Sequence, residues 1–100
     1  MDALYLIPFK AKAWLDLSDL RSKGEHVDSK NIRKHKNDVF RLTELLEVNR
    51  ERLEYLPEAV RADMRRFTER MLLEEIDLKQ IGIKDKSKEE ILEELKKIYT

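Results

Sequence analysis

The sequence contains no cysteine, which excludes disulfide bonds and metal sites built on thiolates. This absence is compatible with a reducing compartment, and the cytoplasm is the expected location. No apolar run approaches the length of about 20 residues that a membrane-spanning helix needs. The apolar segment 4–9 also lacks the basic flank and cleavage site of a signal peptide. We therefore expect a cytoplasmic protein without export signal or membrane anchor.

Glycine and proline occur only twice each, and Val, Ile and Thr rarely alternate with polar residues, so β-strands have little support. The formal net charge is zero because 21 basic residues balance 21 acidic ones. The chain as a whole thus gives no electrostatic reason to bind nucleic acid or a membrane. With 41% hydrophobic residues, the length of 100 residues predicts a single small helical domain over 1–100.

Apolar residues recur at helical spacing in four segments. The first helix is predicted from Pro8, which suits a helix start because it lacks an amide proton, to about Leu20. The second is predicted from a cap at Asp28 or Ser29 to about Val48. Its expected core positions are Ile32, Val39, Leu42 and Leu46, with His35 and Lys36 at the margins.

The third helix is predicted to start at Pro57, and the fourth at a capping box made by Ser87 and Glu90. The fourth extends to about Tyr99, and a loop around Gly82 precedes it. The expected core positions of these two helices are Val60, Met64, Phe67, Met71, Ile91, Leu92, Leu95 and Ile98. The fold class is therefore all-α, a small bundle of about four amphipathic helices.

Lys10 interrupts the apolar side of the first predicted helix. At about 100° per residue it falls on the same face as Leu6, Trp14 and Leu17. Burial of an unpaired ammonium is costly, so the site should offer an anion, either a carboxylate of the protein or a ligand phosphate. Asp38 is the internal candidate. In the simpler alternative, the stem of Lys10 covers apolar surface and the ammonium reaches water.

A polar strip flanks the apolar side of the second predicted helix. It consists of Asn31, Lys34, Asp38, Arg41 and Leu45. Asp38 at the edge of the core would face Lys10 across the helix pair, and one carboxylate among several cations suits a triphosphate. The alternative is that Asp38 makes ordinary surface pairs with Lys34 and Arg41, each worth about 0.2–0.5 kcal/mol.

Other chemical signatures are weak. The two histidines, His26 and His35, lack partners at metal-ligand spacing, so no metal site is predicted. The sequence has no glycine-rich phosphate loop, nucleophile elbow or zinc signature. Tyr5, Phe9, Trp14 and Phe40 are expected in the core, with stacking on nucleic-acid bases as the alternative.

Segments 6–17 (LIPFKAKAWLDL) and 34–42 (KHKNDVFRL) resemble the C-terminal half of the AbiEii/AbiGii toxin family of nucleotidyltransferases. The lysine motif of that family, a Lys followed three residues later by Ala, fits Lys10 and Ala13. The aspartate motif, a basic residue shortly before an Asp and a hydrophobic residue, fits Lys34, Asp38 and Val39. By this resemblance Lys10 would contact the nucleotide phosphates and Asp38 would orient or assist the reacting group, so both are candidate catalytic residues.

The family also has an N-terminal nucleotidyltransferase core with a Gly-Ser motif and an Asp-x-Asp metal motif, and neither motif occurs here. Without the carboxylate pair Mg²⁺ is not held for in-line transfer. We therefore expect the C-terminal part of a larger nucleotidyltransferase-like protein, inactive by itself. The resemblance implies Mg²⁺ and a nucleoside triphosphate as cofactors of the full-length protein, an N-terminal domain as partner, and an antitoxin protein as a further candidate.

The rival prediction is a non-catalytic interaction module. Between residues 21 and 41 there are seven Lys or Arg against three acidic residues, a local charge of +4. The basic strip at 30–41, which consists of Lys30, Arg33, Lys34, Lys36 and Arg41, would bind a partner protein or the backbone of RNA or DNA. If the apolar surface of the first helix is exposed, it would favour a homodimer.

Overall fold

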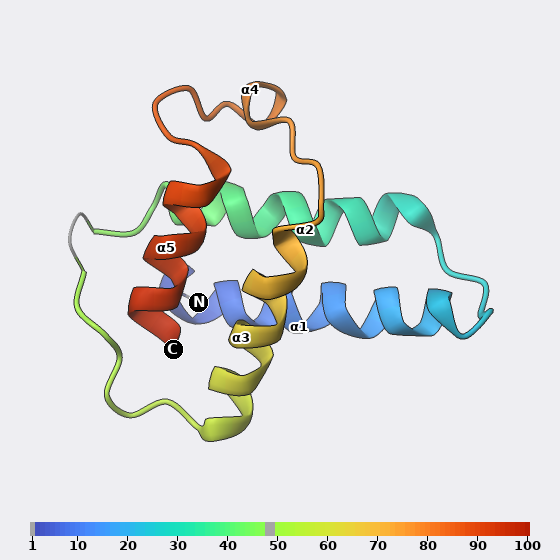
Figure 1. Ribbon diagram of the computed structural model, residues 1–100, viewed down its shortest axis with the longest axis horizontal. Coiled ribbons are helices and arrows are strands. Elements are labelled where there is room, and N and C mark those ends of the chain that lie inside the picture. Colours follow the sequence, from blue (N-terminus) through green and yellow to red (C-terminus); the bar gives the residue numbers. More distant parts are fainter. Residues whose placement is uncertain (1, 48–49) are drawn as a thin grey trace.

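The computed structural model describes residues 2–47 and 50–100. These residues form helices and no strand, which confirms the all-α class (Figure 1). The helices are α1 (Ala3–Ser22), α2 (Ser29–Thr43), α3 (Glu58–Met71), α4 (Leu78–Ile81) and α5 (Lys88–Tyr99). No helix among the described residues is both long and apolar enough to cross a bilayer.

The helices α1 and α2 lie side by side with opposite chain directions, and α3 and α5 cross them (Figure 1). α1 packs against both α2 and α3, and α3 packs against α5. The short α4 lies in the connection between α3 and α5 and contacts α2. The core between these helices contains Leu4, Ile7, Ala11, Trp14, Leu15, Ile32, Val39, Phe40, Met64, Phe67, Met71, Ile83, Ile91, Leu92, Leu95, Ile98 and Tyr99.

The predicted starts of α2 and α5 are confirmed. The Asp28 carboxylate accepts a hydrogen bond from the Lys30 amide at 2.9 Å, so Asp28 is the cap of α2. At α5 the amides of Ser87 and Glu90 each bond to the other's side chain, at 3.2 and 3.1 Å. This is the expected capping box, which satisfies two amides that the first helical turn leaves unpaired.

The ends of the predicted elements differ in two places. α2 stops at Thr43, and Val48, the predicted end, lies outside the described residues. The loop predicted around Gly82 contains α4, which Asp77 caps at the amide of Gln80 and Gly82 ends with a φ of +99°. The four residues of α4 are too few to show a helical period, so the spacing of apolar residues does not predict this helix.

The prediction that α1 starts at Pro8 is wrong. The helix starts at Ala3 with Asp2 as its cap, and Pro8 lies in its second turn. A proline there has no N–H for the carbonyl of Leu4 four residues earlier. The hydroxyl of Tyr99 donates to that carbonyl at 2.5 Å. Burial raises the pKa of Tyr99 far above its usual value, so this hydroxyl stays protonated and remains a donor.

The core stripes also differ in part from the expected ones. Trp14 and Phe40 are buried as predicted, but Tyr5 and Phe9 are 55% and 63% exposed. The buried face of α1 runs through Leu4, Ile7, Pro8, Ala11, Trp14, Leu15 and Ser18, rotated from the expected one. On α2, Phe40 and Thr43 are buried, whereas Leu42 is only half-buried. Leu46, which lies beyond the end of α2, and Val60 in α3 are also half-buried. The remaining predicted core positions of α3 and α5 are buried.

The buried arginine of α3 was not foreseen from the sequence. Arg61 is 5% exposed, and its guanidinium donates to the backbone carbonyls of Leu53 and Glu54 and to that of Tyr99 at 3.4 Å. The amide of Leu53 also donates to the carbonyl of Ile98 at 2.9 Å. These bonds attach the irregular segment before α3 to the end of α5, because a buried guanidinium must satisfy its donors.

We expect Tyr99→Phe to destabilise the fold by about 1–3 kcal/mol, because it leaves the buried Leu4 carbonyl without its donor. In a Pro8→Ala background the same change should cost less, because the new amide of residue 8 can bond to that carbonyl. Urea unfolding followed by circular dichroism measures the four free energies of this double-mutant cycle.

The matched control for this cycle is Tyr55→Phe, since Tyr55 is 97% exposed and should lose its hydroxyl without effect. Equal costs of Tyr99→Phe in both backgrounds would show that the hydroxyl does not substitute for the amide that Pro8 lacks.

Candidate functional site

Lys10 and Asp38 meet between α1 and α2. The Lys10 Nζ lies 3.3 Å from Asp38 Oδ2, and the side chains are only 21% and 20% exposed. The second carboxylate oxygen, Oδ1, lies 3.4 Å from Nη1 of Arg41. The expectation that Lys10 faces Asp38 across the helix pair is thus confirmed. Because the two helices are antiparallel neighbours, residues near the middle of each come together (Figure 1).

His35 belongs to the same cluster, although the sequence placed it only at the margin of the core. Its pKa is lowered, first by burial and then by the positive charge of Lys10, while Asp38 opposes the shift. Its Nδ1 is buried and has no hydrogen-bond partner in the described residues. His35 is therefore a neutral imidazole near neutral pH. His35 could have been assigned to this cluster from the sequence, because residues three apart on a helix, such as His35 and Asp38, are neighbours on its surface.

The cluster is suited to an anion rather than to a metal. Lys10 and Arg41 supply two positive charges against the single carboxylate of Asp38. Across the described residues, no group of three or more His, Asp or Glu is gathered to hold a metal ion. Ammonium and guanidinium groups are the usual partners of phosphate oxygens, and a neutral imidazole nearby is able to accept a proton.

The basic strip predicted at 30–41 is not one uniform surface. Lys30, Arg33 and Lys34 are exposed along α2. Lys36 is instead turned toward the segment after α3, where its Nζ lies 3.3 Å from the Glu74 carboxylate and 3.3 Å from the Glu75 carbonyl. Arg41 pairs with Asp38 as described above. Two of the five cations therefore already have a carboxylate partner within the protein.

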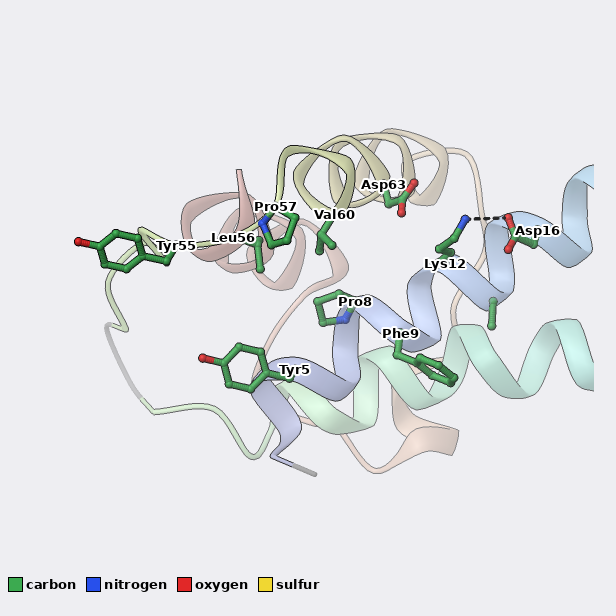
Figure 2. Close-up of a pocket in the computed structure, with 11 residues that line it drawn as sticks. Tyr5, Pro8, Phe9, Lys12, Asp16, Tyr55, Leu56, Pro57, Val60 and Asp63 are labelled. Atoms are coloured by element: carbon green, nitrogen blue, oxygen red, sulfur yellow. Dashed lines mark hydrogen bonds and ion pairs between the residues drawn. The ribbon is translucent and has the colours of Figure 1, made fainter.

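The outer face of α1 forms one wall of an apolar groove with a volume of about 560 Å³ (Figure 2). Tyr5, Pro8 and Phe9 of α1 line one side of the groove. The segment 55–57 and Val60 of α3 line the other side. Charged side chains are confined to one end, at Lys12, Asp16 and Asp63, where Lys12 pairs with Asp16 at 3.4 Å. The outer face of α1 therefore exposes two large apolar side chains, Tyr5 and Phe9, followed by charged residues further along the helix, and such an exposed apolar patch is typical of a contact surface.

Substitutions at the ion pair should move the pKa of His35 in opposite directions. Lys10→Met removes a positive charge that disfavours the imidazolium, so the pKa should rise; Asp38→Asn removes a negative charge that favours it, so the pKa should fall further. NMR titration of the His35 ring protons measures both shifts. The control is Lys12→Met, which removes an exposed lysine from the outer face and should leave the pKa unchanged. Unchanged values in both variants would contradict the cluster.

Comparison of the chain with protein-family models, with curated proteins and with solved structures found no match.

Proposed function

We propose that this chain is the helical module of a nucleotidyltransferase-like protein of the AbiEii toxin type, and that Lys10 and Asp38 are its contribution to a composite nucleotide site. The observation that carries the proposal is the half-buried Lys10–Asp38 pair at 3.3 Å between α1 and α2. It joins the two segments on which the resemblance rests.

The energetics of the pair favour a functional role. Two charges that are four-fifths shielded from water lose much of their hydration, and their mutual attraction often does no more than offset that loss. Replacement of a buried ion pair by apolar residues of similar size is often neutral or stabilising. A lysine at such a place is explained if its ammonium is needed for a ligand, with Asp38 holding it in position until the ligand arrives.

The residues present fit the phosphates of a nucleotide but not its metal ion. Lys10 and Arg41 offer N–H donors, whereas Asp38 is the only carboxylate of the cluster and is already paired with both. Mg²⁺ bound with a nucleoside triphosphate neutralises phosphate charge, and its carboxylate ligands would have to come from another domain. Within this division of roles, Lys10 binds a phosphate, Asp38 positions Lys10 and the neutral His35 is a proton acceptor.

The apolar groove on the outer face of α1 supports the presence of another domain. Phe9 and Lys10 are consecutive, about 100° apart around the helix. A domain that covered Tyr5 and Phe9 would therefore lie next to the ion pair and could complete the site. The same groove supports a second candidate function, a non-catalytic module that binds a protein partner through α1.

The first test is to read the coding sequence upstream of Met1 and in the neighbouring genes for a Gly-Ser segment followed by Asp-x-Asp. The protein that joins such a domain to this chain should transfer labelled nucleotide from a mixture of Mg²⁺ nucleoside triphosphates. Lys10→Met and Asp38→Asn should each reduce the transfer at least about a hundredfold, the effect of removing a group that stabilises developing charge.

Lys23→Met is the control for this assay, because it removes an exposed lysine at the C-terminal end of α1 that lies outside both the cluster and the groove. Full transfer by both site variants, or the absence of any such domain in the neighbourhood, would reject the catalytic role and leave the protein-binding module.

In the isolated chain, Lys10→Met should change the free energy of unfolding by less than about 1 kcal/mol, because Asp38 keeps Arg41 as a partner and remains partly hydrated. Thermal and urea unfolding measure this change. A loss of several kcal/mol would mean that the pair is a structural element of the α1–α2 interface.

A further inference from the structure

A cavity with several polar residues in its lining lies near the C-terminal end of α1. Its volume is about 390 Å³. It is lined by Trp14, Ser18, Arg21 and Ser22 of α1, by Arg70 of α3 and by Leu73 and Glu74 of the segment that follows. Neither Lys10 nor Asp38 lines it, so it is separate from the candidate nucleotide site. All of its walls come from the described part of this chain.

Two side chains in its wall carry polar atoms that the protein leaves unused. The indole Nε1 of Trp14 and the hydroxyl Oγ of Ser18 are buried and have no hydrogen-bond partner in the described residues. The residues are 3% and 7% exposed and lie one turn apart on the same face of α1. The indole N–H is a donor only, and buried polar groups are nearly always paired. Both residues line the cavity, so an acceptor oxygen bound there is a candidate partner for both groups.

Two guanidinium groups add strong donors. Arg70 lies over the Trp14 ring with 4.9 Å between its Cζ and the ring centroid, and its Nη1 donates to Asp19 at 2.9 Å. This geometry holds Arg70 in place while its remaining N–H groups stay available. Arg21 is exposed at the rim and, among the described residues, has no ion-pair partner.

The charged residues that line the cavity are Arg21, Arg70 and Glu74, so its lining carries a net positive charge. Two of these three already have partners, because Arg70 shares Asp19 with Arg66 and Glu74 pairs with Lys36. The hydrogen bonds from Arg66 and Arg70 lower the pKa of Asp19, so it stays ionised. A net positive lining suits a phosphate monoester, which carries about −1.5 to −2 at neutral pH.

We propose that this cavity binds the phosphate group of a small phosphate ester. Arg21 and Arg70 pair with the phosphate, and the Trp14 indole and the Ser18 hydroxyl donate to its oxygens. The site goes beyond the proposed nucleotidyltransferase role, because it uses neither the ion pair nor another domain.

Trp14 is the only tryptophan of the chain, so its signals report directly on the cavity. The intact chain is titrated with inorganic phosphate, with glycerol phosphate and with glycerol, at constant ionic strength set by chloride. Both phosphates should shift the single indole N–H resonance and the tryptophan fluorescence saturably, and glycerol should do neither. Tighter binding of the ester than of inorganic phosphate would show that the cavity also takes the organic part of the ligand.

Arg21→Gln should weaken phosphate binding at least about tenfold, because a charge-assisted hydrogen bond is lost. Lys23→Gln removes the same charge from an exposed position outside the cavity and should leave the affinity unchanged. Ser18→Ala should weaken binding while the melting temperature stays equal or rises, since an unpaired buried hydroxyl is removed.

Three results would overturn the proposal: no saturable shift with either phosphate, the same shift with chloride alone, or equal weakening by Arg21→Gln and Lys23→Gln. Because no step involves Lys10 or Asp38, these results leave the nucleotidyltransferase proposal untouched, and failure of that proposal leaves the phosphate site standing.

Discussion

The hydrogen bond from the Tyr99 hydroxyl to the Leu4 carbonyl is the contact on which the arrangement of this chain depends. It joins the last turn of α5 to the first turn of α1, and the two ends of the chain lie together as a result (Figure 1). It also supplies the donor that Pro8 cannot offer, so α1 continues through a proline without leaving a buried carbonyl unpaired. Arg61 stabilises the same region, because its guanidinium donates hydrogen bonds to the carbonyl of Tyr99 in α5 and to that of Glu54 in the segment before α3.

α1 is the element around which both proposed sites and the groove are arranged. Its inner face forms the core, one flank holds Lys10 against Asp38 of α2, and the outer face forms the apolar groove. Its C-terminal half lines the polar cavity with Trp14 and Ser18. Tyr5 and Phe9 leave large apolar side chains exposed on this helix, which is explained if its outer face contacts something other than water.

Positive and negative charges are distributed unevenly over these surfaces, although the net charge of the chain is zero. The Lys10 cluster and the cavity beside Arg70 each carry more cations than carboxylates, whereas Lys36 and Arg41 of the basic strip are partly neutralised by Glu74 and Asp38. We therefore expect anion binding at these two places, where the side chains of Lys10 and Asp38 are 21% and 20% exposed and Trp14 and Ser18 are buried. Partial burial strengthens an ionic contact, because fewer water molecules screen it.

The all-α class, the caps at Asp28 and Ser87 and most of the core of α3 and α5 could be predicted from the amino-acid sequence, because these depend on local spacing and on hydrogen bonds between near neighbours. The sequence also indicated the Lys10–Asp38 pair, since a cation on an apolar face needs an anion. The start of α1 and its buried face depend on long-range contacts, because the donor that replaces the missing N–H of Pro8 is the Tyr99 hydroxyl at the far end of the chain. The polar cavity depends likewise on α1 and α3, which are brought together only by folding.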